Sequence, residues 1–554
     1  MSKIHSLSIK NFRGIKEFNH VFGNEKFIVL IGRGNSGKTT ILQAINYVLS
    51  PTWNVGLSDL DFYNTDVTHP IEIEATITDF PKELLTDSKY GLYVRKIKDG
   101  QVIDDFLEED DSGLADALSI RFRVDSSLEP KWHVFCGRDE SEPKEITAND
   151  RAKFNVFMVA DYADNQFSFG RYSPLSALMK LSSAEGESVA QKLLEIVRKI
   201  HELTAENGSF NEVEGILEIL KTDSSQLGLS LEQLKTAIEF KDNSISGNSI
   251  ALHNGNIPYR RSGKGSKRLL SIAIQKQLTR TGGIVLIDEL EQGLEPDRII
   301  NITRYLKSGL SGQIFVTTHS SYTLVEASYN NLFLMREGAK SLVTFDKSMQ
   351  GLLRTKPWAF FAKKIICCEG KTEQGFIRGA DTYLREKEQG SLSSFGVFPI
   401  DCKGGDNFIR DANALKVLGY EVFVVMDNDV KDIRKLLHNL DKVSIPYMKY
   451  EEGFSLESQI IKDVSWDCIK KLVNCNLERF VDDVKQELDV SDLDLSQESE
   501  FRDKFARLAK EKSLYKDIPG GEFLAEQVLP ELTVLGDDVV LKKNINTLLG
   551  WIKN

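Results

Sequence analysis

The segment GRGNSGKT (32–39) constrains the fold more than any other feature of the sequence. It fits the pattern G-x-x-x-x-G-K-[ST] and lies between an expected buried strand, FIVLIG (27–32), and an expected helix, TILQAINYVL (40–49). Backbone N–H groups at the start of such a helix bind phosphate groups. The pattern therefore predicts a P-loop α/β fold that binds ATP through Gly32, Asn35, Ser36, Gly37, Lys38, Thr39 and Thr40. Thr39 is also a candidate Mg²⁺ ligand.

Two later strand ends carry polar residues that complement this loop. IVLIDE (284–289) ends in Asp288, a candidate Mg²⁺ ligand at the ATP site, and Glu289, a candidate catalytic residue that polarises the attacking water. His319 ends the next expected strand, QIFVTTHS (313–320). A histidine at a strand end is either structural or, as a catalytic residue, a sensor of the γ-phosphate. Its place one strand after Asp288 favours the sensor.

A glycine-containing basic segment, RRSGKGSKRLLSIAIQ (260–275), precedes the IVLIDE strand. Ser262, Gly263 and Gly265 open an expected helix, which makes a second N-terminal anion site. One interpretation is a loop with a solvated basic face. The other is the signature loop of an ABC-type ATPase, which touches the γ-phosphate bound to a second subunit.

The composition restricts the class of protein. Seventy Lys and Arg against 82 Asp and Glu give a formal net charge of −12, so binding to DNA requires local basic patches. A hydrophobic fraction of 41% excludes a wholly disordered chain. No apolar run reaches the length of a membrane span, no export signal begins the chain, and the six cysteines form no disulfide framework. We expect a cytoplasmic protein without a membrane partner.

The pattern changes to continuous helical spacing from about residue 185. VAQKLLEIVRKIHEL (189–203), VEGILEIL (213–220) and LEQLKTAIEF (231–240) follow one another with no strand between them. This predicts a helical insertion, which is either a lever or dimer contact or a plain structural layer. The predicted division is an N-terminal ATPase part (1–180), the insertion (181–245), a C-terminal ATPase part (246–355) and a last domain with a helical tail (356–554).

Acidic residues follow two expected strands in the last domain. IICCEGKTE (365–373) places Glu369 after an apolar run and Glu373 one turn into a helix, and VFVVMDND (422–429) ends with Asp427 and Asp429. The carboxyl ends of parallel strands share one crevice, so we expect the four carboxylates to converge. Such a cluster calls for Mg²⁺ or Mn²⁺ as a counter-charge. Two ions would hold a phosphodiester and activate water for its cleavage.

The order of these motifs resembles known families. ATPase heads of the ABC superfamily in its SMC and RecF branch begin with I-x-NFRG, which residues 9–14 match as IKNFRG. The segment E-G-x-x-E followed by D-x-D is similar to the Toprim domain of topoisomerases, primases and nucleases. Both parts in one chain resemble the OLD (overcoming lysogenization defect) nucleases, among them the Gabija nuclease subunit and retron-associated OLD effectors. Two departures are SGKGS in place of the LSGGQ signature and the lack of a clear glutamine loop.

This resemblance implies further residues and a function. OLD nucleases carry another acidic metal ligand after D-x-D, for which Glu457 is the candidate, and a late catalytic lysine, for which we prefer Lys516 over Lys510 and Lys512. The resemblance also implies an ATP-regulated, metal-dependent DNA endonuclease of antiphage defence that forms a homodimer or higher homo-oligomer. A co-encoded partner would be a UvrD-like helicase or a retron reverse transcriptase with its DNA.

Two other functions stay open. One is a RecF-like or SMC-like ATP-switched DNA-binding scaffold with an inactive Toprim domain, against which the complete acidic set argues. The other makes the chain one subunit of a toxin–antitoxin or retron assembly that is silent until phage infection.

Overall fold

The chain folds as two compact units in the computed structural model. Unit 1 is formed by Met1–Leu30, Asn35–Thr318 and Glu337–Leu342, and unit 2 by Ile31–Gly34, His319–Arg336 and Val343–Asn554. The structure describes residues 2–104, 114–138, 142–159, 173–175, 195, 199, 252–254, 256–280, 282–404, 407–428, 433–474, 488 and 498–554. Nearly all of the predicted helical insertion (181–245) and the candidate ligand Asp429 lie outside these described residues.

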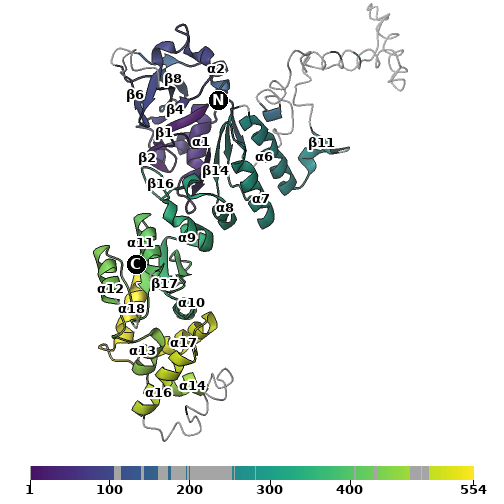
Figure 1. The fold of residues 1–554 in the computed structure, drawn as a ribbon. Coiled ribbons are helices and arrows are strands. Elements are labelled where there is room, and N and C mark those ends of the chain that lie inside the picture. Colours follow the sequence, from purple (N-terminus) through teal and green to yellow (C-terminus); the bar gives the residue numbers. More distant parts are fainter. Residues whose placement is uncertain are drawn as a thin grey trace, which may run out of the picture. The chain divides into compact units, whose positions relative to one another are not determined.

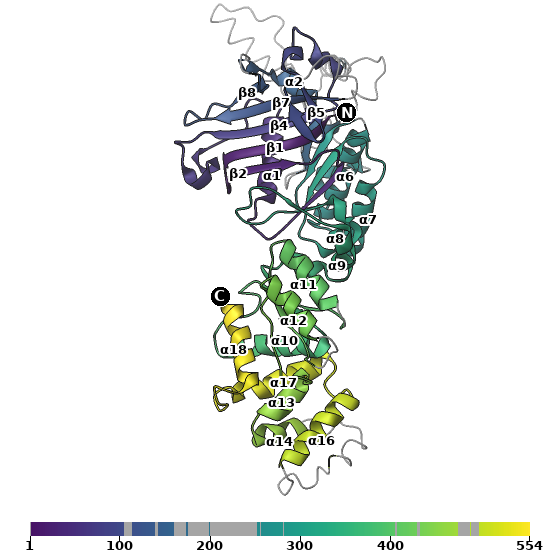
Figure 2. The ribbon, with the colours of Figure 1, turned by 60° about the vertical axis from the view of Figure 1, so that its left-hand side comes forward.

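An antiparallel sheet forms one half of unit 1. Its strands β2, β1, β4, β7, β5 and β6 follow one another in space, β8 also pairs with β7, and β9 pairs with β8. Apolar residues alternate along β4 and β7, as the sequence predicts for half-buried strands, and their inner side chains pack on α1 (Lys38–Val48). In Figure 2, β8, β7, β4, β1 and β2 run side by side. The bounds are β1 (Lys3–Phe12), β2 (Ile15–Val21), β4 (Ile71–Thr78), β5 (Arg95–Lys98), β6 (Gln101–Ile103), β7 (Ala115–Val124), β8 (Lys131–Phe135) and β9 (Lys144–Glu145).

The second sheet carries the P-loop strand. Its order is β10-β13-β14-β3-β15-β16, with β10, β13, β14 and β3 parallel to one another. Every residue of β3, β13 and β14 is buried, which explains their continuous apolar runs. Figure 1 shows α6 (Lys264–Arg280) and α7 (Pro296–Lys307) beside β14. The strands are β3 (Phe27–Ile31), β10 (Val156–Val159), β13 (Ile284–Ile287), β14 (Gln313–Thr317), β15 (Leu332–Leu334) and β16 (Val343–Thr344).

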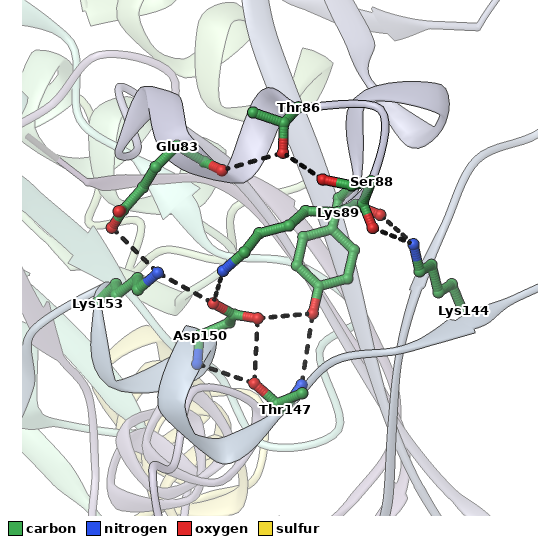
Figure 3. A network of polar contacts seen from close by, with 9 residues as sticks. Glu83, Thr86, Ser88, Lys89, Lys144, Thr147, Asp150 and Lys153 are labelled. Atoms are coloured by element: carbon green, nitrogen blue, oxygen red, sulfur yellow. Dashed lines mark hydrogen bonds and ion pairs between the residues drawn. The ribbon is translucent and has the colours of Figure 1, made fainter.

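A network of polar side chains around Asp150 joins α2 to the segment that contains Lys89 and Tyr90 (Figure 3). Asp150, in α2 (Ala148–Ala152), accepts hydrogen bonds from Lys89 Nζ (2.5 Å), Tyr90 Oη (3.1 Å) and Thr147 Oγ1 (3.0 Å). Lys153 Nζ lies 3.1 Å from the same carboxylate. Burial opposes ionisation of Asp150, but these donors outweigh it and lower the pKa of Asp150 to about 2. The carboxylate is therefore fully compensated.

Unit 2 contains a three-stranded parallel sheet, β18-β17-β19, with one hydrophobic core that extends into its C-terminal helices. The strands are β17 (Lys364–Cys368), β18 (Val397–Asp401) and β19 (Glu421–Val425). The long helices are α10 (Lys371–Glu386), α11 (Asn407–Val417), α12 (Ile433–Lys442), α13 (Leu456–Asp463), α14 (Trp466–Asn474), α16 (Glu498–Glu511), α17 (Ile518–Glu531) and α18 (Val540–Lys553).

Helices α10 and α17 pack backbone to backbone. A Cβ atom on Gly375 would lie 2.2 Å from the carbonyl oxygen of Ile518, and one on Gly521 would lie 2.1 Å from that of Thr372. A Cβ atom on Gly379 would lie 2.4 Å from Cβ of Ala525. Three glycines therefore let the two helices approach more closely than any side chain would permit.

Short elements complete the described part of the chain. They are 3₁₀ helices η1 (Asp59–Asp61), η2 (Tyr63–Thr65), η3 (Lys82–Leu85), η4 (Gly91–Tyr93), η8 (Tyr259–Arg261), η9 (Tyr329–Asn331), η10 (Lys347–Met349) and η11 (Pro357–Phe361), helices α8 (Ser321–Glu326) and α9 (Gln350–Thr355), and strands β11 (His253–Asn254) and β12 (Ile257–Pro258). Among the described residues, no helix combines the length and apolar character needed to cross a bilayer.

Candidate functional site

The P-loop turns sharply between β3 and α1. Gly32, Asn35 and Gly37 have φ angles of 145°, 60° and 99°, and α1 begins directly after Gly37. Left-handed residues of this kind turn successive N–H groups toward one side and create a concave anion-binding surface. The geometry is therefore that of a phosphate-binding loop at a helix N-terminus. The other predicted residues of the loop are buried Ser36 and Lys38, exposed Thr39 and half-buried Thr40.

Lys38 is a buried cation in this loop. It is 5% exposed, and its Nζ donates a hydrogen bond to Ser36 Oγ at 3.5 Å. Burial lowers the pKa of Lys38 to about 8, although nearby carboxylates favour the charged form. Those carboxylates belong to Asp288, Glu291 and Glu289. Because burial disfavours its charge, Lys38 gains from an anionic ligand that shares the site.

Asp288 joins the P-loop helix to the next strand end. Its Oδ1 accepts hydrogen bonds from Thr39 Oγ1 (2.9 Å) and Thr317 Oγ1 (2.6 Å). These hydroxyls come from α1 and β14, while Asp288 follows β13, so three elements meet at one carboxylate. The structure thus brings together Thr39 and Asp288, the two predicted Mg²⁺ ligands of the ATP site.

Glu289 lies beside this carboxylate in an uncommon backbone conformation. Its φ is 49°, its N–H donates to Thr317 Oγ1 at 2.7 Å, and its side chain is exposed. A non-glycine residue in the left-handed region is often found where function fixes the backbone. Two residues later, Glu291 Oε2 accepts a hydrogen bond from Thr318 Oγ1 at 2.6 Å.

The segment with Ser262, Gly263 and Gly265 leads into α6, as predicted, and Gly263 is exposed. The first turns of α6 pack on the chain that follows β13. A Cβ atom on Gly265 would lie 2.7 Å from the carbonyl oxygen of Gly293, and Arg268 Nη2 donates to the carbonyl oxygens of Asp288 and Glu289, the latter at 2.9 Å. The start of α6 is therefore tied to the backbone that carries the two acidic residues.

Two further predicted features occupy defined positions. His319 is exposed just beyond the end of β14, and its ring lies 6.2 Å from that of Phe361. Arg13, in the NFRG motif, donates from Nε to Asp61 Oδ1 at 2.8 Å. Asp61 also accepts a hydrogen bond from the backbone N–H of Ser58 at 2.9 Å and so caps the 3₁₀ helix η1.

The predicted acidic residues of unit 2 come from four elements. Glu369 follows β17, Glu373 lies in α10, Asp427 follows β19 and Glu457 lies in α13; we call these four residues the acidic cluster. Glu369 Oε2 accepts from the backbone N–H of Asp427 (3.0 Å), and Asp427 Oδ1 accepts from that of Leu456 (2.9 Å). Hydrogen bonds from backbone N–H groups to these carboxylates thus connect the ends of β17 and β19 with the start of α13.

Burial makes ionisation of the acidic cluster costly. Glu373, Asp427 and Glu457 are 2%, 8% and 3% exposed. Burial, together with the charge of Glu457, raises the pKa of Glu373 to about 7. Burial and the charges of Glu373 and Glu457 raise the pKa of Asp427 well above its usual range. Carboxylates held in this way are stabilised by a cation.

Lys516 provides such a cation. Its Nζ lies 3.0 Å from Glu457 Oε1 and 3.7 Å from Asp427 Oδ2. Burial opposes its charge, yet the carboxylates of Glu457 and Asp427 outweigh burial and raise the pKa of Lys516. Of the three candidate lysines, this one lies at the acidic cluster, whereas Lys510 and Lys512 are exposed at the end of α16.

The chemistry of the acidic cluster suits a hard divalent cation. All four side chains offer carboxylate oxygens, the ligands that Mg²⁺ and Mn²⁺ prefer. Glu457 Oε2 is buried and has no hydrogen-bond partner in the described part of the chain. Among the described residues, however, no three His, Cys, Asp or Glu side chains are already arranged to hold a metal ion. The acidic cluster therefore has the ligand type that the ion prefers, but its side chains must rearrange before they can coordinate one ion.

Comparison with known proteins decides the family. A family model described as "AAA domain, putative AbiEii toxin, Type IV TA system" matches residues 27–326, more than half of the chain. The chain belongs to this AAA domain family. A second model, described as the TOPRIM domain of overcoming lysogenization defect protein-like proteins, matches residues 360–429. The predicted OLD architecture, an ATPase head followed by a Toprim domain, is confirmed.

Solved structures resemble the chain at low identity. The Smc head domain with an extended coiled coil bound to the C-terminal domain of ScpA, from Pyrococcus furiosus, is 17% identical over 64% of this chain and 99% of that one, with a TM-score of 0.35. The recombination mediator protein RecF with ATP is 14% identical over 62% of this chain and 99% of that one, with a TM-score of 0.33. A comparison with curated proteins gave no match.

The AAA domain contains site residues that motif reading did not identify. Thr317 and Glu291 contact the predicted residues, and Arg268 holds the backbone of Asp288 and Glu289. Thr317 and Glu291 lie within the segments TTHS and DELEQ, so their polar character was a usable signal. The contact of Arg268 depends on how α6 packs, which no spacing rule gives.

Proposed function

We propose that the protein is an ATP-regulated, divalent-metal-dependent DNA endonuclease whose cleavage site is the acidic cluster of the OLD-like TOPRIM domain. One observation carries the proposal: four carboxylates from separate elements form the acidic cluster, and the Lys516 ammonium pairs with two of them, Glu457 and Asp427. Four acidic side chains at one place have no structural use that apolar residues would not serve better. A metal-dependent phosphodiesterase does need them.

The side chains have distinct proposed roles in cleavage. Glu369, Glu373, Asp427 and Glu457 hold the cation, and Asp429, outside the described residues, completes the set. When bound, Mg²⁺ or Mn²⁺ supplies Lewis-acid activation of water and of the scissile phosphate. Lys516 neutralises the charge that develops on the phosphate oxygens. Its side chain is 40% exposed, so a polymer such as DNA can reach this side chain.

ATP is proposed to bind at the P-loop and to regulate this cleavage. Lys38 neutralises the phosphate oxygens, and Thr39 with Asp288 holds Mg²⁺. Glu289 polarises the attacking water and His319 senses the γ-phosphate. The exposed Gly263 at the start of α6 suits contact with ATP on a second subunit, so the working form is at least a homodimer.

Antiphage defence is the proposed setting. The matching family model names a putative toxin of a type IV toxin–antitoxin system, which supports a protein that acts against its own cell during infection. A co-encoded helicase or reverse transcriptase would then control it. The competing function is an ATP-switched DNA scaffold with an inactive Toprim domain. It is favoured by the lack, among the described residues, of three side chains already arranged around a metal.

Plasmid cleavage and phosphate release, measured together, separate the two functions. Wild type with Mn²⁺ or Mg²⁺, with and without ATP, is compared with Asp427→Ala and with Asp467→Ala, an exposed aspartate of α14. We expect Asp427→Ala to lose cleavage by at least about 100-fold and to keep ATP turnover. Asp467→Ala should behave as wild type. Equal cleavage by Asp427→Ala and wild type would contradict the nuclease assignment of the acidic cluster and favour the ATP-switched DNA scaffold.

A further inference from the structure

The acidic cluster and Lys516 form an unequal set of charges. Three of its carboxylates, those of Glu373, Asp427 and Glu457, are buried, and one ammonium faces them. Lys516 Nζ lies within 4 Å of the carboxylates of two of these acids, Glu457 and Asp427. Removing the ammonium would leave buried carboxylates with no cation, which is strongly unfavourable.

Lys516 reaches the acidic cluster from the solvent side. Its side chain is 40% exposed, whereas that of Glu457 is 4% exposed. It lies on the short segment that leads into α17, and its ammonium is at the end of a flexible four-carbon side chain. The ammonium can therefore turn away from the acidic cluster toward solvent by rotation about the bonds of its own side chain, without any change in the fold.

The backbone places the lysine at this position. Thr372 Oγ1, in α10, donates a hydrogen bond to the carbonyl oxygen of Tyr515 at 3.0 Å. The glycine contacts between α10 and α17 hold the same segment close to Glu373. The proximity of Lys516 to the acidic cluster is therefore built into helix packing and does not depend on the ion pairs alone.

The arrangement of carboxylates matches an ammonium rather than a metal. Two of them, Glu457 and Asp427, lie at ion-pair distance from Lys516 Nζ, whereas no three of the described side chains converge on a common metal position. At the same time the buried Glu457 Oε2 has no hydrogen-bond partner among the described residues, so Lys516 does not satisfy the whole cluster. The acidic cluster therefore keeps capacity for a second or stronger cation.

We propose that the Lys516 ammonium is a built-in cation that neutralises the acidic cluster in the metal-free protein and must leave it before Mg²⁺ or Mn²⁺ binds. The lysine then sets the metal affinity of the site, and its release places a positive charge at the mouth of the site only when metal is present. This regulation rests on the proposed function, since it concerns the same site.

Metal binding by the full chain, in the absence of nucleotide, tests this competition. Isothermal titration with Mn²⁺ compares wild type with Lys516→Met, Lys516→Arg and the exposed-lysine control Lys512→Met. Asp427→Asn gives the background from other sites. We expect Lys516→Met to bind Mn²⁺ at least roughly tenfold more tightly than wild type, because no ammonium has to be displaced. Lys516→Arg and Lys512→Met should stay near wild type.

Two results would overturn the proposal, and they differ in meaning. Equal Mn²⁺ affinity of wild type and Lys516→Met would show that the ammonium does not compete, while the metal site itself would stand. If neither protein bound Mn²⁺ above the Asp427→Asn background, the metal site would be absent and the nuclease function would fall with it.

A second measurement needs no metal and tolerates loss of stability. Thermal unfolding in EDTA is recorded for Lys516→Met, Glu457→Gln and the double variant. If the ammonium neutralises the cluster, Lys516→Met lowers the midpoint strongly, and adding Glu457→Gln restores part of it. Additive effects of the two changes would contradict the proposed role. Far-UV circular dichroism of each variant establishes that the compared proteins are folded.

Discussion

The two candidate sites each contain a lysine among carboxylates, and the two lysines respond in opposite ways. Lys38, in unit 1, is 5% exposed, and burial lowers its pKa to about 8 in spite of three nearby acids. Lys516, in unit 2, has a side chain that is 40% exposed, and its pKa is raised because Glu457 and Asp427 outweigh burial. Burial dominates at the first site and the neighbouring charges dominate at the second.

This difference indicates which ligand each site lacks. Around Lys38, left-handed residues turn backbone N–H groups inward, so the site is rich in donors and gains from an anion. Around Lys516, three buried carboxylates lie with one ammonium among the described side chains, so the site gains from a cation. A nucleotide phosphate and a divalent metal are the ligands that remove these opposite deficits.

Loss of the Lys38 ammonium should have the strongest effect on ligand binding. Lys38→Ala should weaken ATP binding by roughly 100-fold or more, because the phosphates lose a charged hydrogen-bond donor. Isothermal titration with ATP measures it, and Lys16→Ala, at an exposed position of β2, is the matched control. Unchanged ATP affinity in Lys38→Ala would remove the P-loop assignment. Plasmid cleavage that persists in this variant would show that ATP regulates the cut without powering it.

A smaller effect is expected at the start of α6. Gly263→Glu should lower ATP turnover by roughly tenfold, since it adds negative charge where the γ-phosphate of a second subunit is proposed to dock. Gly263 is the informative position because a Cβ atom there meets nothing within 4 Å, whereas one on Gly265 would collide with the carbonyl oxygen of Gly293. Gly263→Ala is the control and should turn over ATP normally. Normal turnover in Gly263→Glu would separate this loop from the nucleotide.

The acidic cluster should make the metal-free protein sensitive to pH. The pKa of Glu373 rises from an ordinary 4.5 to about 7 on folding, so the folded state holds this proton more tightly than the unfolded state. Its stabilising contribution is fully present below pH 4.5 and is lost as pH rises through 7, on the order of 3 kcal/mol in total. Thermal unfolding in EDTA from pH 4.5 to 8 measures this slope. The slope should flatten in Glu373→Gln, and an unchanged slope would count against the buried-acid description.

Two buried aspartates, Asp150 and Asp427, should change the free energy of unfolding in opposite directions when each is replaced by asparagine. Asp150 is compensated by Lys89 and Lys153, with its pKa lowered to about 2, so Asp150→Asn should destabilise the protein by about 1–2 kcal/mol. Asp427 has a raised pKa, because burial and the carboxylates of Glu373 and Glu457 oppose its charge, so Asp427→Asn should stabilise the metal-free protein. Urea unfolding in EDTA at pH 7 measures both. The same sign for the two variants would mean that Asp427 is as well compensated as Asp150.

Motifs predicted the parts of the sites that lie at strand ends. Asp288, Glu369 and Asp427 each follow an apolar run, and the carboxyl end of a parallel strand fixes where the next residue points. The P-loop is equally local, because its conformation depends on Gly32 and Gly37 themselves. These features could be read from the sequence because each depends on a few consecutive residues.

Other features could not be read because packing between distant segments decides them. β18 was not predicted, since Pro399 interrupts the run expected of a strand. The choice of Lys516 over Lys510 and Lys512 rests on the position of α17 against α10, and the burial of Glu457 on the position of α13. The contact of Arg268 likewise depends on where α6 lies.

The glycines between α10 and α17 limit how this site could be transferred to another protein. Gly375, Gly379 and Gly521 contribute no charge, yet the short distance between Lys516 and the acids depends on the atoms that these residues lack. Transplanting only the lysine and carboxylates into another scaffold would therefore fail to reproduce their spacing. A random library at the three positions, selected for folded protein that binds Mn²⁺, should return almost nothing but glycine.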